Sequence, residues 1–186
     1  MWWLDHRARL ITRLAIVLAI GGLAAGCFQP LYGDRVAAGG GDTATALSSV
    51  EITPIDTPKG TRLSRVGFEV RNELMYSLTG GAGGIAPTHR LDVRLSSSQL
   101  QVIVDINSSR PEIQNYGIDA SYTLIDLATG KPVVRGQTFS RVSYNIPGQQ
   151  QRFAGERGLR DAENRAAKVI SDNIRSRLAS YFVAGG

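Results

Sequence analysis

The 186-residue chain contains a single cysteine, Cys27, whose thiol is the strongest nucleophile type in the sequence. An intramolecular disulfide is excluded because there is no second cysteine. Cys27 directly follows the tetrapeptide Leu23-Ala24-Ala25-Gly26, whose small residues suit a peptidase cleavage site. Two roles remain for the thiol: burial as a small hydrophobic group, or attachment of a lipid to the sulfur. The neighbouring residues favour lipid attachment.

The residues before Cys27 have the three-part layout of a secretory signal peptide. Three arginines between positions 7 and 13 precede an apolar run from Leu14 to Leu23, and the small residues follow. This run is about half of the roughly 20 residues that a membrane-spanning helix needs. The stretch from Leu23 to Cys27 is also similar to the bacterial lipobox. Residues 1–26 are therefore predicted to be a cleaved lipoprotein signal peptide, after which Cys27 is the lipid-bearing first residue.

The composition of the remaining chain limits its class. Removal of residues 1–26 takes three Arg and one Asp from the formal charge of +5, which leaves +3. Such a mild basic excess does not indicate nucleic-acid binding. Residues 27–46 are small, polar and rich in glycine, so they are predicted to be the lipidated N-terminus and a flexible tether. Residues 47–186 are long enough for a single domain with its own core.

Alternating apolar and polar residues predict four strands in this domain. The first covers Ser49 to Ile55, and the second continues from His89 to Ile106 as one long or bulged strand. The third covers Tyr116 to Leu124, and the fourth covers Val133 to Tyr144. The turn-forming sequence from Asp126 to Lys131 predicts that the last two strands form a hairpin.

Apolar residues at spacings of three and four predict two helices. The stripe of the first helix consists of Leu63, Val66, Val70, Leu74 and Leu78, and Gly80 to Gly84 would end it. The stripe of the C-terminal helix consists of Ala167, Ile170, Ile174, Leu178 and Tyr181, widened by Val169 and Phe182. Its other face carries charged residues of both signs three or four positions apart, which predicts a solvated surface.

The element order is strand, helix, three strands, helix. One apolar stripe on each helix and one apolar side of an antiparallel sheet can cover each other. The sequence therefore predicts an α+β two-layer sandwich, in which two helices pack on one face of a mostly antiparallel four-stranded sheet.

Catalytic constellations are missing from the sequence. His89 is the only histidine after residue 26, and the run Ser96-Ser97-Ser98 has no evident base to activate it. Glu69 and Glu73 lie one helical turn apart, but their neighbours Arg65 and Arg71 favour surface ion pairs. No nucleophile elbow, zinc-binding motif or phosphate-binding loop is present. We therefore expect a protein that is not an enzyme and that needs no cofactor and no metal.

Three features resemble the LPS-assembly lipoprotein family, LptE. The segment Cys27-Phe28-Gln29-Pro30-Leu31-Tyr32-Gly33 is similar to the Cys-Gly-Phe-Gln-Pro-Leu-Tyr-Gly start of many members, with one Gly fewer. The helical segment Gly67-Phe68-Glu69-Val70-Arg71-Asn72-Glu73-Leu74 is similar to the Arg-Asn-x-Leu stretch of the family's first helix. The predicted order of strands and helices also agrees with the family.

The resemblance implies an outer-membrane, periplasm-facing lipoprotein that plugs the LptD β-barrel, helps it assemble and takes part in lipopolysaccharide delivery to the outer leaflet. Phe28 follows the lipidated cysteine, whereas Asp at that position is the usual inner-membrane retention signal in enteric bacteria. Two alternatives remain. One is a periplasm-facing lipoprotein that binds a small apolar or anionic ligand in its own pocket, which a large internal cavity would favour. The other is a lipid-anchored hydrolase, which lacks the necessary residues.

Arginine outnumbers lysine in the chain after residue 26, and guanidinium groups bind phosphate through two parallel hydrogen bonds. If the domain contacts the phosphates of lipid A, some arginines must be free of carboxylate partners. The candidates lie on predicted strands, away from the charged helix faces: Arg90, Arg94, Arg135 and Arg141.

The role of Cys27 leads to a first prediction. Cys27→Ala should abolish fatty-acid labelling and leave the precursor unprocessed, because the sulfur that accepts the lipid is absent. Labelling with radioactive fatty acid and the size of the product on a gel would measure this. Phe28→Ala is the control, since it keeps the thiol and should still be labelled. Label on the Cys27→Ala protein would contradict the prediction.

Overall fold

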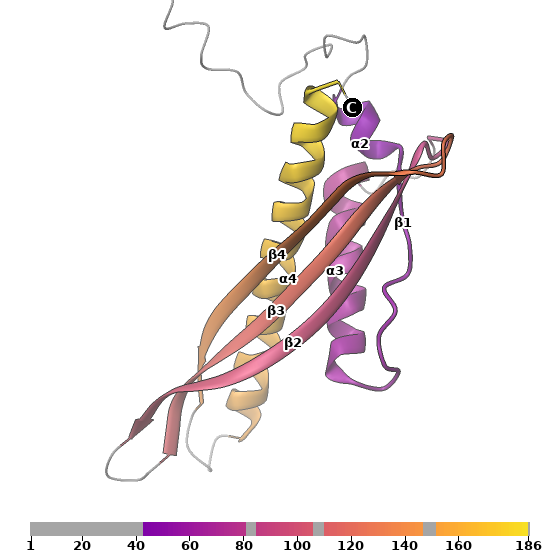
Figure 1. Cartoon of the computed structure of the whole chain (residues 1–186). Coiled ribbons are helices and arrows are strands. Elements are labelled where there is room, and N and C mark those ends of the chain that lie inside the picture. The colour runs from indigo at the N-terminus through magenta and orange to yellow at the C-terminus, as the bar shows by residue number, and fades with distance from the viewer. Residues whose placement is uncertain (1–42, 81–84, 106–109, 147–151, 186) are drawn as a thin grey trace, which may run out of the picture. The chain divides into compact units, whose positions relative to one another are not determined.

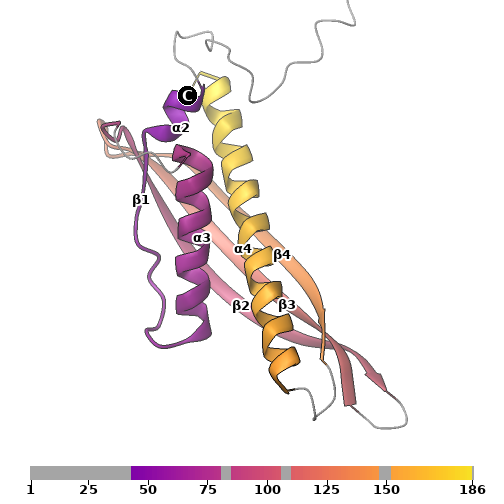
Figure 2. The ribbon, with the colours of Figure 1, turned by 180° about the vertical axis from the view of Figure 1, so that it is seen from behind.

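The computed structural model of the chain describes residues 43–80, 85–105, 110–146 and 152–185. Figure 1 shows the sheet in front of α3 and α4, and Figure 2 shows the same two helices across its other face. The predicted α+β fold, with two helices on one face of a four-stranded, mostly antiparallel sheet, is confirmed. The elements in chain order are α2 (Thr43–Ser48), β1 (Val50–Ile52), α3 (Arg62–Thr79), β2 (His89–Asp105), β3 (Arg110–Asp126), β4 (Pro132–Asn145) and α4 (Arg152–Val183).

The strands lie in the order β1-β2-β3-β4. β1 is parallel to β2 and pairs only three residues, whereas β2, β3 and β4 are antiparallel neighbours over most of their length. β1 is shorter than the predicted strand from Ser49 to Ile55. Pro54 has no N–H to give to a ladder, and the last bond along this edge runs from the Thr53 N–H to the Leu91 carbonyl (3.2 Å). β2 therefore has a strand on this side only near its start.

β2 is one long strand with an irregularity, as predicted. The three serines at 96–98 keep a regular register, with Ser96 opposite Asp119 and Ser98 opposite Gly117. The register shifts between Gln101 and Val104, beyond the serines. Ser96 and Ser98 thus remain on the same side of the sheet as Arg94.

The predicted hairpin between β3 and β4 is present, and Asp126 organises its turn. The carboxylate of Asp126 accepts hydrogen bonds from the Ala128 N–H (2.9 Å) and the Thr129 hydroxyl (2.8 Å). These bonds lower the pKa of the Asp126 carboxyl from its ordinary value, because they favour its charged form. Gly130 takes a positive φ of 68°, which closes the turn without strain.

The ends of α3 are set by its capping residues. The hydroxyl of Thr61 accepts a hydrogen bond from the Ser64 N–H (3.2 Å), which satisfies a free donor of the first turn. At the other end Gly80 adopts the left-handed conformation and donates its N–H to the Tyr76 carbonyl (2.9 Å). The predicted glycine stop is confirmed at Gly80, and residues 81–84 lie outside the described residues.

The core lies between the helix layer and the inner face of the sheet. The alanines of α4 allow close contact with the other elements, and the buried Ser171 hydroxyl donates to the Val70 carbonyl of α3 (3.3 Å). The predicted stripes face this core except at two positions: Leu63 is only partly buried, and Val169 is 42% exposed and does not widen the second stripe. The largest fully buried hydrophobic side chains are Val66, Val70, Leu74, Leu91, Ile118, Leu124, Ile170, Ile174 and Leu178.

A short helix, α2, precedes β1 and was not predicted. Thr43 and Leu47 are buried, and α2 contacts both α3 and α4. Residues 43–46, which the composition assigned to the tether, are therefore helical. The composition of residues 43–46 resembles that of a linker. Only the contacts of α2 with α3 and α4 show that these residues belong to the folded domain. Cys27 lies outside the described residues.

The ion pairs predicted within α3 are wrong. Arg65 pairs instead with Glu163 of α4, and it also donates to the Asn164 side chain (3.3 Å). Arg71 donates to the Ile52 carbonyl of β1 (3.4 Å). Both arginines therefore connect α3 to neighbouring elements. A solvated ion pair within one helix would have contributed only about 0.3–0.5 kcal/mol.

The packing leads to a second prediction. Leu74→Ala and Ile174→Ala should each lower the free energy of unfolding by about 2–5 kcal/mol, because each leaves a cavity in the core. Chemical denaturation followed by circular dichroism would measure this. Phe68→Ala is the control on α3, since Phe68 is 67% exposed and its truncation should change stability by less than about 0.5 kcal/mol. Equal midpoints for Leu74→Ala and Phe68→Ala would contradict the assignment of the apolar face.

Candidate functional site: the uncovered face of the sheet

Alternation along the three long strands gives the sheet two different faces. Leu91 and Val93 of β2 point toward the helices and are buried, so Arg90, Asp92 and Arg94 belong to the opposite face. No described element packs against that face, which Figure 1 shows toward the viewer. We call it the outer face. Its central exposed residues are Arg94, Ser96, Ser98, Asp119, Ser121, Arg135, Gln137, Phe139 and Arg141.

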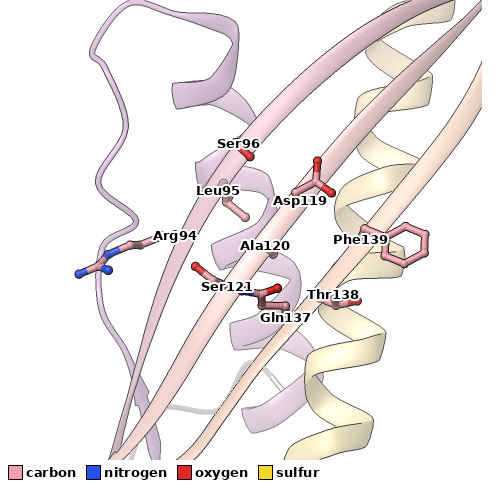
Figure 3. Close-up of a pocket in the computed structure, with 9 residues that line it drawn as sticks. All are labelled: Arg94, Leu95, Ser96, Asp119, Ala120, Ser121, Gln137, Thr138 and Phe139. Carbon is pink, nitrogen blue, oxygen red and sulfur yellow. The ribbon is translucent and has the colours of Figure 1, made fainter.

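The strand register arranges these residues in rows across the sheet. Arg94, Ser121 and Gln137 are opposite one another on β2, β3 and β4. Ser96, Asp119 and Phe139 form the next row. These two rows surround an open, shallow hollow of about 390 Å³, which Figure 3 shows. Its surface combines hydroxyl and amide groups with one aromatic ring.

The four arginines predicted as candidate phosphate contacts all lie on the outer face, but they differ in their partners. Arg141 donates to both carboxylate oxygens of Asp119 (2.8 and 3.0 Å). The Nε of Arg90 lies 3.5 Å from Oδ1 of Asp92. The expectation that all four are free of carboxylates is therefore wrong for Arg141 and Arg90. The register of β3 and β4 brings Arg141 near Asp119, and the alternation of β2 puts Arg90 and Asp92 on the same face two positions apart.

Arg94 and Arg135 differ from those two. Within the described ranges neither has a carboxylate partner, and both side chains are exposed. Figure 3 shows Arg94 extending away from β3, past the edge of β2. These two guanidinium groups can bind an external anion without first breaking an ion pair.

Arg141 is held in a fixed position on the outer face. Its Nη1 donates to the Ile118 carbonyl (3.1 Å), and its guanidinium lies 5.5 Å from the ring centroid of Phe139. The side chain passes over Gly117, where an added Cβ would lie 2.8 Å from the Arg141 Cδ. A glycine at this position therefore allows Arg141 to reach Asp119. Phe139 remains 67% exposed beside this ion pair.

The hydroxyl groups on the outer face have no catalytic partner among the described residues. Asp119 is occupied by Arg141, and the only described histidine, His89, lies at the start of β2. His89 accepts from or donates to the Thr88 hydroxyl (2.8 Å), and its ring packs edge-on against Phe182 with centroids 5.2 Å apart. Burial lowers the pKa of His89, and the nearby Asp126 partly opposes this effect. His89 thus joins the end of α4 to the sheet.

No helix in the described ranges is both long enough and apolar enough to cross a membrane. Within the same ranges, His, Cys, Asp and Glu form no group of three or more that could hold a metal ion.

Solved structures of lipoproteins have the same fold. A putative lipoprotein from Caulobacter crescentus CB15 aligns with a TM-score of 0.59 at 21% identity, over 77% of this chain and 97% of its own. The rare lipoprotein B from Shewanella oneidensis aligns with a TM-score of 0.51 at 13% identity, over 73% and 96%. An uncharacterized lipoprotein B from Nitrosomonas europaea aligns with a TM-score of 0.52 at 13% identity, over 74% and 90%. At these identities the likeness establishes a common fold. No protein-family model and no curated protein matches the sequence.

Proposed function

We propose that this chain is an outer-membrane lipoprotein that plugs an LptD-type β-barrel, helps it assemble and takes part in lipopolysaccharide delivery. Cys27 would carry the lipid anchor, and the domain would face the periplasm. Three independent features support the proposal. They are the similarity of residues 27–33 to the start of the LptE family, the fold shared with lipoproteins, and the nature of the outer face.

The outer face is the observation that carries the proposal. Three strands of 14 to 17 residues present a broad surface that no described element covers. Its side chains are mainly hydroxyl, amide and charged groups, with Phe139 and Leu100 as exposed apolar points. The lumen of a large outer-membrane barrel is polar. A polar sheet face therefore suits contact with the inside of such a barrel, where a purely apolar face would not.

The alternative of a ligand bound within the domain's own pocket has less support. A protein of that kind would have a large internal cavity lined by strand residues. The inner face of the sheet is instead filled by side chains of α3 and α4, many of them fully buried. The hollow of about 390 Å³ on the outer face is open to the surface, as is a hollow of about 430 Å³ between the described parts of α3 and α4.

Contact with lipopolysaccharide is the second part of the proposal. Lipid A carries phosphates, and a guanidinium group binds phosphate best where no carboxylate competes for it. Arg94 and Arg135 meet this condition on the outer face, whereas Arg90 and Arg141 would have to leave Asp92 and Asp119. We therefore assign the phosphate contacts to Arg94 and Arg135.

Co-purification tests the barrel role. The lipidated protein should retain one large β-barrel when it is affinity-purified from outer membranes. Ser121→Trp should reduce the amount of barrel retained, because it places a bulky side chain at the centre of the outer face. Ser121→Ala is the matched control and should retain the barrel. Unchanged thermal unfolding of both variants would show that the fold is intact.

The barrel role is contradicted if no barrel co-purifies with the unmodified protein. If Ser121→Trp retains as much barrel as Ser121→Ala, the outer face is not the contact surface.

The lipopolysaccharide contact has its own test. Arg94→Glu combined with Arg135→Glu should weaken lipopolysaccharide binding by about tenfold or more, since each charge-assisted contact contributes about 1.5–3 kcal/mol before screening. Lys59→Glu with Lys131→Glu is the control, because it changes the net charge equally at exposed positions off this face. Equal binding by the two double variants, measured at about 150 mM salt, would remove the contact while leaving the barrel role unaffected.

A further inference from the structure

A second charged hollow lies between α3 and α4, in the helix layer. Its volume is about 430 Å³. Gly60, Thr61, Arg62 and Arg65 line it from the start of α3, and Phe153, Glu156, Arg157, Arg160 and Glu163 line it from the first part of α4. We call it the arginine groove. It belongs to the opposite layer from the outer face of the sheet.

The two helices begin at the same end of the domain. Arg62 near the start of α3 contacts Glu156 near the start of α4, and Val70 farther along α3 contacts Ser171 farther along α4. The two helices therefore run in the same direction, as Figure 2 shows. The N-terminal end of a helix carries a partial positive charge, so the two helix dipoles add at the arginine groove. The first turns of α3 and α4 contain no acidic residue that would offset this charge.

Two of the four arginines in the groove are already paired. Arg62 donates to both oxygens of Glu156 (3.0 and 3.2 Å). Arg65 pairs with Glu163, which is 3% exposed and therefore fixed by the packing of α4. The Arg65–Glu163 pair is partly buried in the wall of the groove, whereas the Arg62–Glu156 pair is exposed to solvent.

Arg157 and Arg160 are the other two arginines. They lie three positions apart on α4, so they share one face of the helix, and both are exposed. Among the described residues neither has a carboxylate partner. The four arginines and two glutamates leave the groove with a net charge of about +2, and this excess is located on Arg157 and Arg160. Like charges three positions apart on a helix repel each other, and a bound anion would relieve this repulsion.

Phe153 gives the groove an apolar edge. Its side chain is 86% exposed, the highest exposure among the large hydrophobic residues described. An aromatic ring in water next to two unpaired guanidinium groups can pack against the apolar part of a ligand whose anionic part the arginines bind.

We propose that the arginine groove binds a phosphate monoester, with Arg157 and Arg160 as its principal ligands and Phe153 in contact with the group that carries the phosphate. Two sources of the phosphate fit this site, a small soluble ester and a lipid headgroup. Guanidinium forks match the geometry of phosphate oxygens. Glu156 and Glu163 line the groove but are paired with Arg62 and Arg65, which leaves Arg157 and Arg160 to bind the phosphate. The site requires no barrel partner, so it does not depend on the function proposed above.

Isothermal titration calorimetry of the full chain in a neutral detergent tests the site. Glucose 1-phosphate is the soluble probe, and phosphatidic acid in mixed micelles is the lipid probe. Arg157→Gln with Arg160→Gln should weaken binding of the recognised probe by about tenfold or more. Arg165→Gln with Arg177→Gln removes the same charge from α4 outside the groove, and it should bind as the unmodified chain does.

The two probes distinguish the sources of the phosphate. Binding of glucose 1-phosphate would identify a soluble ester, and binding of phosphatidic acid alone would identify a lipid headgroup. The proposal is overturned if the unmodified chain binds neither probe, or if the two double variants bind within about twofold of each other. Because all four substituted residues are exposed, matching thermal unfolding curves are expected, and the single variants Arg157→Gln and Arg160→Gln should each show part of the loss.

Phe153→Ser tests the apolar edge separately. It should weaken binding of whichever probe the groove recognises, because the ring contacts the group that carries the phosphate. Undiminished binding of that probe by Phe153→Ser would overturn the assignment of Phe153.

Discussion

Burial of one apolar face of the sheet under α3 and α4 is the constraint on which the other features depend. β1 pairs only three residues of β2, so the helices and not a further strand stabilise the sheet. Leu91, Ile118 and Leu124 are fully buried against helix side chains such as Ile174 and Leu178. Each such side chain contributes about 1.5–3 kcal/mol by leaving water. Because α4 contacts α3, β3 and β4, its removal would expose the core from two sides.

The same constraint explains which parts of the fold were predictable. A stripe such as Val66, Val70 and Leu74 repeats with the helical period, and the alternation of β3 repeats with the strand period, so both can be read locally. α2 could not be predicted, because the buried positions of Thr43 and Leu47 depend on α3 and α4. Its composition is that of a linker.

Partners of charged residues were the least predictable part of both sites. Glu69 lies four positions from Arg65 in the sequence, yet Arg65 pairs with Glu163, 98 residues away. Asp119 and Arg141 come together only through the register of β3 and β4, and Gly117 provides the space for that contact. Local spacing identifies arginines that can bind an anion. Only the tertiary structure shows that Arg94 and Arg135 remain available, and that Arg157 and Arg160 share a groove.

The parallel arrangement of α3 and α4 also gives the domain a mechanical property. α4 has 32 residues and is about 48 Å long, with the arginine groove beside its first turns. α2, through which the chain enters the domain, lies beside the other end of α4 (Figures 1 and 2). A rigid body held near α2 behaves as a lever. A rotation of about 20° at that end carries the groove through an arc of about 17 Å, so small changes of angle at the entry point become large displacements at the far end.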